Sequence, residues 1–156
     1  MDEKALRAVV DAVVRQVTES LTLETARRLS ERVRAEAARL GVKAVVAVSD
    51  RAGRPILVEC MDDAYIASYD IAVNKAFTVT ALKMSTSELK PLAQPGGSLY
   101  GIQFTNDGKI VIFGGGEPLK VGETIVGGLG VSGGSEEQDT ALAAYGKRIF
   151  ESGGTR

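Results

Sequence analysis

The chain has 156 residues, with 19 Lys and Arg against 20 Asp and Glu, which gives a net charge of -1 at pH 7. This length fits one domain, and the balanced charge argues against nucleic acid or an anionic membrane as a partner. Without histidine and with a single cysteine, Cys60, the chain excludes a Ser-His-Asp triad, a His-ligated metal and an internal disulfide. We therefore expect a reducing cytosolic compartment, no metal site and, since no run approaches about 20 apolar residues, no membrane span.

The first forty residues predict two helices. Thr22 is the expected N-cap of the second, which runs to about Leu40 and ends before Gly41. Its inward-facing residues are expected to be Leu23, Ala26, Leu29, Val33, Ala37 and Leu40. The first helix is rich in valine, a mediocre helix former, so it needs a partner surface. Its apolar stripe consists of Leu6, Val9, Val10, Val13, Val14 and Val17.

The next segment predicts a hairpin followed by two helices. Residues 42–49 and 55–61 form β-branched apolar runs, joined by a turn at 50–53. Ser68 is the expected N-cap of a helix over 69–84. The Ser85-x-x-Glu88 pattern predicts a capping box that opens a short helix to Leu92.

The last third predicts three strands and a final helix. The strands are expected at 99–104, 109–113 and 123–131, with a turn at 106–108 and a loop at 114–118. The Ser135-x-x-Gln138 pattern predicts a second capping box, opening a helix to about Phe150. We expect a disordered tail at 151–156. Tight hairpins and grouped helices indicate an α+β fold with an antiparallel sheet of five strands.

Glycine is concentrated in two places, which hold eight of the 18 glycines: Gly114-Gly115-Gly116 and the run from Gly127 to Gly134. The second run leads from a strand toward the helix expected after Ser135. Such a corner presents backbone N–H groups and the positive end of a helix dipole to an anion. The alternative is close packing between sheet and helix, which glycine also permits. Neither run matches a Walker motif, so support for nucleotide binding is weak.

Lys75 lies among apolar residues on a predicted helix, one turn from Ile71 and close to Thr78. It is either a desolvated cation that faces an anionic ligand or a lysine whose stem packs while its head reaches water. The Cys60-Met61-Asp62-Asp63 segment offers donor atoms for a metal. Neighbouring aspartates at a strand end are more often simply solvated, and Cys60 is expected to be a small buried residue rather than a nucleophile.

The ordered combination of these blocks resembles the GlcG/HbpS family, which includes the C-terminal domain of PduO-type proteins. The resemblance covers about residues 21–150. The matching blocks are Val45 to Asp50, Gly53, Glu59 to Asp62, Ser68, Asp70 to Ala72, Lys75, Ala76, Thr78, Pro95-Gly96, Gly114 to Gly116, Pro118-Leu119, Gly127, Gly130 to Gly134 and Gln138-Asp139.

The resemblance implies a profilin- or PAS-like fold, an antiparallel five-stranded sheet flanked by helices, and assembly into dimers, tetramers or octamers. It also implies association with haem, another tetrapyrrole or a corrinoid in some members, and links to glycolate or to diol and glycerol catabolism. PduO-type domains that bind haem use a histidine, which this chain lacks. A haem would then depend on Met61, Met84, Lys75, a tyrosine, a threonine or a group from a partner.

The leading hypothesis is an accessory, homo-oligomeric domain that binds a tetrapyrrole, a corrinoid or a small hydroxy acid. Lys75 would supply the cation, glycine amides would hold a carboxylate or phosphate, and Tyr65, Tyr69 and Tyr100 would flank a planar ring. The candidate ligand-binding residues are Ser68, Lys75, Thr78, Tyr100, Gly115, Gly116, Ser132, Gly133 and Gly134.

Two other hypotheses stay open. In the first, the protein is an enzyme acting on a small diol, aldehyde or hydroxy acid, with Asp62, Asp70, Lys75 or a tyrosine as its acid or base. In the second, residues 1–20 form an interaction segment that docks in a groove. This segment resembles the peptides that target enzymes to bacterial microcompartments. A helix packed on the domain or at a subunit interface is the alternative.

Overall fold

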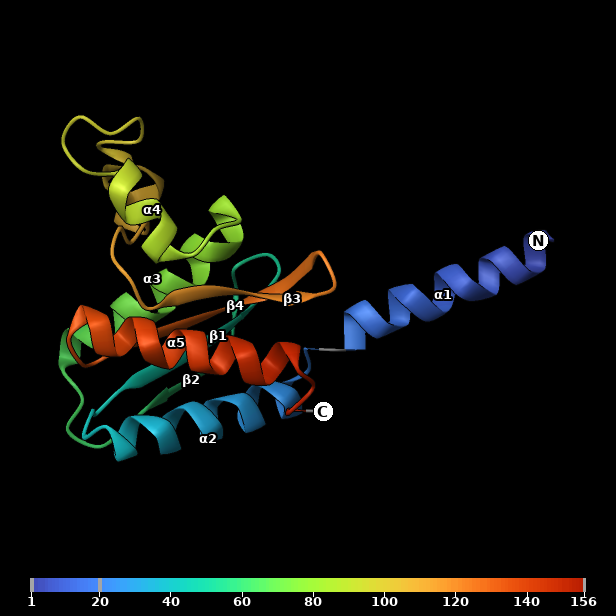
Figure 1. Cartoon of the computed structure of the whole chain (residues 1–156), viewed down its shortest axis with the longest axis horizontal. Helices are drawn as coiled ribbons and strands as arrows, with labels where there is room; N and C mark the ends of the chain where they lie inside the picture. The colour runs from blue at the N-terminus through green and yellow to red at the C-terminus, as the bar shows by residue number, and fades with distance from the viewer. Residues whose placement is uncertain (1, 20, 156) are drawn as a thin grey trace.

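The computed structural model describes residues 2–19 and 21–155, with the side chains of the first helix described up to residue 15 (Figure 1). Its helices are α1 (Glu3–Glu19), α2 (Leu23–Arg39), α3 (Ile66–Leu82), α4 (Thr86–Leu92) and α5 (Glu136–Glu151), with short 3-10 helices η1 (Ile102–Phe104) and η2 (Asn106–Gly108). The strands are β1 (Val45–Asp50), β2 (Pro55–Cys60), β3 (Gly116–Val121) and β4 (Thr124–Ser132). They form an antiparallel sheet in the order β2-β1-β4-β3.

The sheet lies between two helical layers, with α2 and α5 on one face and α3 on the other (Figure 1). The alternation of side chains along β1 supplies both interfaces. Val46 and Val48 join the larger core under α2 and α5. Val45 and Ala47 join a smaller core with Ala72 of α3. The buried apolar run of the sequence therefore reflects a strand that is covered on both faces.

Glycines of β4 allow α3 to lie directly on the sheet. A Cβ atom at Gly130 would collide with the backbone oxygen of Ala72, and one at Gly128 with the backbone oxygen of Ala76. Of the two interpretations of the second glycine run, close packing therefore accounts for its strand portion. This close contact also brings the side chain of Lys75 toward the end of β4.

The prediction of five strands is wrong for the described residues, because the sheet has four. Residues 99–104 form turns and η1, and Gly101 there has a φ of +93°, which interrupts an extended run. Residues 109–113 pair with no strand, and the backbone N–H of Val111 instead donates to Thr78 Oγ1 at 3.0 Å. The predicted loop at 114–118 supplies the start of β3, which pairs with β4.

Three predicted helix starts are confirmed and one is wrong. Thr22 caps α2, and capping boxes at Ser85 and Ser135 open α4 and α5. The third helix begins at Ile66, so Ser68 is not its N-cap. Ser68 is instead buried in the first turn of α3, where its hydroxyl is available to partners across the interface. The shift also brings Tyr65 to the helix boundary.

The N-terminal helix α1 projects away from the sheet and its helices (Figure 1). Its apolar stripe is about half exposed at Leu6, Val9, Val10, Val13 and Val14. The side chain of Val17, the last member of the predicted stripe, lies outside the described residues. In α2, Leu23 was expected to face inward but is exposed, because it precedes the stretch that reaches the sheet. Among the described helices, none is long and apolar enough to cross a membrane.

The C-terminal end differs from the expected disordered tail. Residue 151 belongs to α5, and the following turn is closed by hydrogen bonds from Gly153 N–H to Phe150 O and from Gly154 N–H to Ile149 O. Thr155 is buried. These contacts return the chain toward the core, and Arg156 lies outside the described residues.

Candidate functional site

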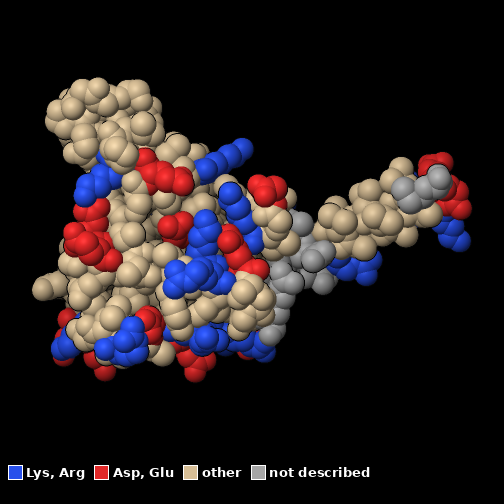
Figure 2. Space-filling model, viewed as in Figure 1, with Lys and Arg blue, Asp and Glu red and all other residues tan. Residues whose placement is uncertain are grey.

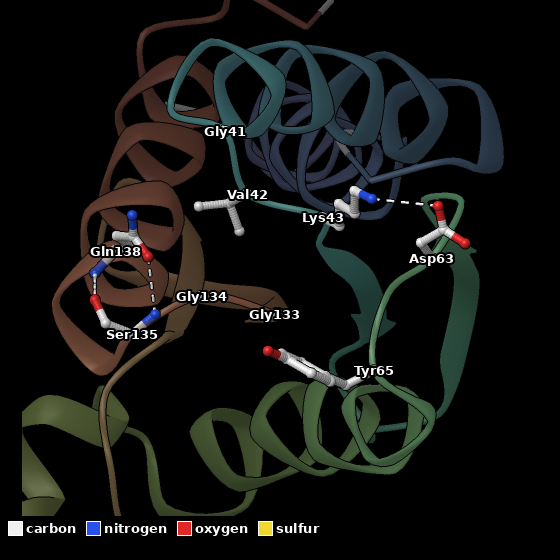
Figure 3. Close-up of a pocket in the computed structure, with 9 residues that line it drawn as sticks. All are labelled: Gly41, Val42, Lys43, Asp63, Tyr65, Gly133, Gly134, Ser135 and Gln138. Atoms are coloured by element: carbon white, nitrogen blue, oxygen red, sulfur yellow. Dashed lines mark hydrogen bonds and ion pairs between the residues drawn. The ribbon is translucent and has the colours of Figure 1, made fainter.

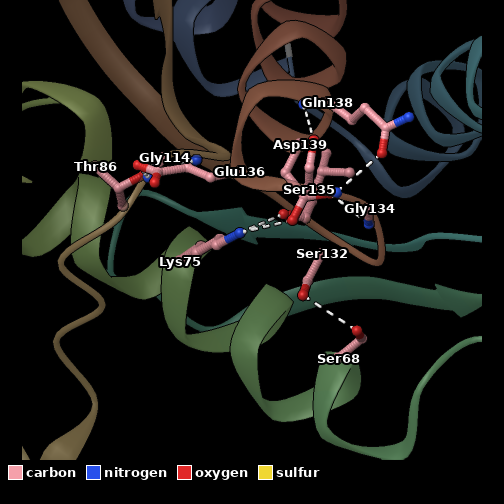
Figure 4. A network of polar contacts seen from close by, with 12 residues as sticks. Ser68, Lys75, Thr86, Gly114, Ser132, Gly134, Ser135, Glu136, Gln138 and Asp139 are labelled. Carbon is pink, nitrogen blue, oxygen red and sulfur yellow. Dashed lines mark hydrogen bonds and ion pairs between the residues drawn. The ribbon is translucent and has the colours of Figure 1, made fainter. Parts of the chain in front are cut away.

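A buried cation lies at the junction of α3, β4 and α5. The side chain of Lys75 is fully buried, and its Nζ donates to Val131 O at 2.8 Å and to Asp139 Oδ2 at 3.3 Å (Figure 4). The same nitrogen lies 4.9 Å from the ring centroid of Phe113, a distance suited to a cation–π contact. Of the two interpretations of Lys75, the structure supports a desolvated cation, and the anion it faces belongs to the chain itself.

Asp139 is the acceptor at this junction, and the glycine corner supports it. Asp139 Oδ1 accepts from the backbone N–H of Gly134 at 2.9 Å, and the backbone of Gly133 also favours its charged form. Burial raises the pKa of Asp139 and lowers the pKa of Lys75, and each charge opposes the shift of the other. An anion site was one of the two interpretations of the corner, and in the structure the carboxylate of Asp139 accepts from the corner's Gly134 N–H.

Gly115 and Gly116, which were predicted to hold a ligand, contact buried groups of the chain itself. Gly115 has a φ of +114°, and a Cβ atom there would lie 2.6 Å from Lys75 Nζ. Its carbonyl accepts from the N–H of Val131. The N–H of Gly116 donates to Thr86 Oγ1 at 2.9 Å. Gly115 therefore lies directly against the ion pair, and Gly116 is held by the first residue of α4.

The remaining predicted residues separate into two groups. Ser68 and Ser132 meet at 3.2 Å between their hydroxyl oxygens, close to the ion pair (Figure 4). Thr78 lies outside this group. Its hydroxyl donates to Asn74 O and accepts from the backbone N–H of Val111. Tyr100 is 62% exposed in the turns before η1. The structure therefore brings together Ser68, Lys75, Ser132, Gly133 and Gly134 and leaves Thr78 and Tyr100 outside this cluster.

Two adjoining cavities open beside the cluster. One of about 530 Å³ lies between the α2–β1 connection, the start of α3 and the glycine corner (Figure 3). The other, of about 270 Å³, extends along α3. Both are lined by Tyr65, Gly133 and Gly134. We call the two together the Tyr65 groove.

The Tyr65 groove has a polar part and an apolar part. The larger cavity contains Lys43 and Asp63, whose Nζ and Oδ2 atoms lie 3.2 Å apart, and Gln138. The smaller cavity is lined by Ile71 and by Phe113, among others. None of these was among the candidate ligand-binding residues predicted from the sequence. Asp63 was noted only as a possible metal donor and Ile71 only as a neighbour of Lys75. For Asp139 there was a signal, since a buried lysine requires a carboxylate partner.

A third cavity, of about 420 Å³, contains Cys60 together with Arg34 and Lys43. Cys60 is exposed, so the expectation of a buried residue is wrong. It is the last residue of β2, an edge strand of the sheet. Asp62 and Asp70, two acid–base candidates of the enzyme hypothesis, are exposed as well.

Comparison with protein families gives one match over most of the chain. The family model described as "Haem degrading protein HbpS-like" matches residues 21–148. The match begins after α1 and includes every residue of the Tyr65 groove. The N-terminal helix therefore lies outside the part that the family model describes.

Two relatives of known sequence are similar to the chain. An uncharacterized 15.0 kDa protein of the dhaT-dhaS intergenic region of Citrobacter freundii is 44% identical over 124 residues, which covers 80% of this chain and 87% of that protein. The corrinoid adenosyltransferase PduO of the same organism is 37% identical over 154 residues, covering 96% of this chain. The chain spans only 46% of the length of that PduO.

Solved structures show the same fold. The Klebsiella pneumoniae protein ORFY has a TM-score of 0.81 at 42% identity, over 83% of this chain and 90% of that one. The PduOC:heme complex has a TM-score of 0.79 at 38% identity, over 82% and 93%. HbpS of Streptomyces reticuli, solved as a double mutant, has a TM-score of 0.73 at 29% identity, over 83% and 86%.

Proposed function

This chain belongs to the HbpS-like family, and we propose that it is an accessory protein that binds a tetrapyrrole, either haem or a corrinoid, in the Tyr65 groove. The similar PduOC structure is a complex with haem, and the similar PduO is a corrinoid adenosyltransferase. Both relatives support a tetrapyrrole as the class of ligand. A small hydroxy acid is the alternative ligand of the same proposal.

The observation that carries the proposal is the amphipathic lining of the Tyr65 groove. A tetrapyrrole has a flat apolar ring system and polar groups at its edge. Ile71 and Phe113 offer apolar surface at one end, while Lys43 and Gln138 offer polar groups at the other. The larger cavity, at about 530 Å³, falls within the usual range of small-molecule sites. The aromatic ring of Tyr65 lines both cavities, so it would lie beside a ligand bound in the groove.

The residues of the groove fit a tetrapyrrole without the histidine that haem proteins often use. Tyrosine is an established iron ligand, and Tyr65 lines both cavities. When bound, the group would supply a metal centre, while the chain would orient it and shield one face. Lys75 and Met61, two iron donors that the sequence suggested, already have internal partners. Lys75 donates to Asp139, and Met61 Sδ accepts from the N–H of Ala44, with 3.4 Å between nitrogen and sulfur.

The cellular setting stays part of the proposal. We propose a role beside glycolate or diol catabolism, within a bacterial microcompartment, as a homo-oligomer. The exposed apolar stripe of α1 supports a docking role for residues 1–20. Since the family model begins at residue 21, such a role would be an addition to the family core.

The test is a titration of the full chain with ferric haem, hydroxocobalamin and glycolate, followed by absorption and calorimetry. We expect saturable binding of one of the two tetrapyrroles. Ile71→Glu places a charge in the apolar part and should weaken binding at least about tenfold. Ile66→Glu on the same helix is the control, because Ile66 is 97% exposed and does not line the groove. Binding of neither tetrapyrrole would contradict a tetrapyrrole as the ligand, and saturable binding of glycolate would then favour the hydroxy acid. Equal tetrapyrrole binding by both variants would contradict the Tyr65 groove as the site.

A further inference from the structure

Tyr65 has a side chain that the fold itself does not use. It occupies the N-cap position of α3, with φ −59° and ψ 139°, but its side chain makes no capping hydrogen bond. The side chain is 74% exposed. Its hydroxyl points into the larger cavity of the Tyr65 groove (Figure 3). An aromatic residue held at this position without a local partner is available to a ligand.

The other side-chain oxygens that line the groove already have partners. Asp63 pairs with Lys43, and Glu136 with Lys90. Ser135 and Gln138 bond each other's backbone N–H in the capping box. The hydroxyls of Ser68 and Ser132 pair with each other, and Asp139 holds Lys75. Among the described residues that line the groove, the phenol of Tyr65 is therefore the oxygen donor without an internal partner.

The phenol of Tyr65 shares its cavity with a charged pair. Lys43 and Asp63 line the same cavity, with Lys43 Nζ 3.2 Å from Asp63 Oδ2. Ferric iron is a hard cation that binds phenolate oxygen, as in haem proteins with a tyrosine ligand. Cys60, an exposed soft donor, lies in the neighbouring cavity and lines neither part of the groove.

We propose that Tyr65 Oη, as the phenolate, ligates the iron of a ferric haem bound in the Tyr65 groove, in place of the histidine that this chain lacks. The inference rests on the proposed function. On binding, the O–H bond of the phenol breaks and its proton passes to water, while an iron–oxygen bond forms. The iron stays ferric, so no oxidant or reductant takes part.

The experiment compares ferric haem complexes of the full chain, Tyr65→Phe and Tyr69→Phe. The unchanged chain should show a phenolate-to-iron charge-transfer band and tyrosinate vibrations in its resonance Raman spectrum. Tyr65→Phe should lose both and bind haem about tenfold or more weakly. Tyr69→Phe should keep both. Tyr69 was expected from the sequence to flank a planar ring, but it is an exposed tyrosine of α3 that does not line the groove. Equal thermal midpoints confirm that the variants are folded.

The outcomes separate this inference from the proposed function. If the unchanged chain binds haem without tyrosinate signals, or if Tyr65→Phe keeps the spectrum, Tyr65 is not the ligand and the proposed function stands. A thiolate-type spectrum that disappears in Cys60→Ser would place the iron in the neighbouring cavity and overturn the inference. If the unchanged chain binds no haem at all, the haem form of the proposed function fails as well.

Discussion

Lys75 Nζ and Asp139 Oδ2 lie 3.3 Å apart, and both side chains are almost completely removed from solvent. Lys75 comes from the helix on one face of the sheet and Asp139 from the first turn of α5 on the other. The pair therefore fixes the start of α5, and with it the glycine corner that lines the Tyr65 groove. A buried pair of this kind is costly to break on one side.

Lys75→Met should destabilise the protein strongly, because it leaves the Asp139 carboxylate buried without its cation. We expect a loss of about 3–5 kcal/mol in the free energy of unfolding. Chemical denaturation of the two proteins at neutral pH measures it. Lys90→Met is the control, since Lys90 forms a more exposed pair with Glu136, and should cost about 1 kcal/mol or less.

The double variant Lys75→Met, Asp139→Asn distinguishes the ion pair from simple loss of packing, because asparagine keeps an oxygen that can accept from the Gly134 N–H. Removing both charges avoids the buried unpaired group, so the double variant should be more stable than Lys75→Met alone. If the double variant is the less stable of the two, the cost of Lys75→Met comes from packing, and the ion pair is not what holds the corner.

Gly115→Ala should destabilise the protein by crowding the ion pair. A Cβ atom there would lie 2.6 Å from Lys75 Nζ, and the residue has a φ of +114°. Gly108→Ala is the matched control, because Gly108 also has a positive φ, of +72°, but open space around it. Denaturation should show that Gly115→Ala costs about 1–3 kcal/mol more than Gly108→Ala. Equal losses would mean that backbone strain alone sets the effect.

Helix boundaries were predictable where side chains cap the backbone locally. Thr22, Ser85 and Ser135 each satisfy N–H groups within three residues, so the signal lies in a short stretch of sequence. The same local pattern gave a wrong N-cap at Ser68. A serine before a helical run is a typical N-cap, but the partner of Ser68 is Ser132, 64 residues away. Strands 99–104 and 109–113 were predicted from apolar content, which does not reveal whether a neighbour is available for pairing.

Only part of the candidate site could be predicted from the sequence. Lys75 and the glycine corner stood out because a lysine among apolar residues and a glycine run before a helix are both chemically conspicuous. Their anion could not be identified, because Asp139 becomes their partner only when α5 folds back on β4. Lys43 carries no signal of its own, and Asp63 was noted only as a possible metal donor. Both are exposed residues of connections, and only the fold brings them together.

Glu117 gives a pH dependence with a definite sign. Burial raises its pKa above the usual 4.5, although Lys147 at 3.6 Å opposes the shift. The folded protein therefore holds this proton more tightly than the unfolded chain does. The resulting stability is fully present below pH 4.5 and is lost as the pH rises through the raised pKa. Glu117→Gln removes the titration, so the stability of the natural chain should fall relative to this variant as the pH rises from 4 toward 7. A constant difference across this range would contradict the shift.

Deletion of residues 1–20 should leave the domain folded. The described apolar side chains of α1 are about half exposed, and the family model begins at residue 21. We expect the free energy of unfolding to change by no more than about 0.5 kcal/mol, as for surface changes. Denaturation and a measurement of molecular mass check this. If the shortened protein unfolds or dissociates, α1 is part of the architecture, and its proposed docking role loses its basis.

The charges at the polar end of the Tyr65 groove predict two opposite effects on haem affinity. Haem carries propionate groups, and Lys43 is the cation of the larger cavity, with Asp63 as its exposed partner at 3.2 Å. Lys43→Ala should weaken binding and Asp63→Asn should strengthen it, because the first removes an attraction and the second frees the lysine and removes a repulsion. Exposed charges interact by about 1 kcal/mol or less, so each change should stay within about fivefold in Kd. Both effects should shrink as salt is added. Lys83→Ala is the control, because Lys83 is an exposed lysine at the far end of α3. If Lys83→Ala weakens binding as much as Lys43→Ala does, the attraction comes from the overall charge of the protein and not from this groove.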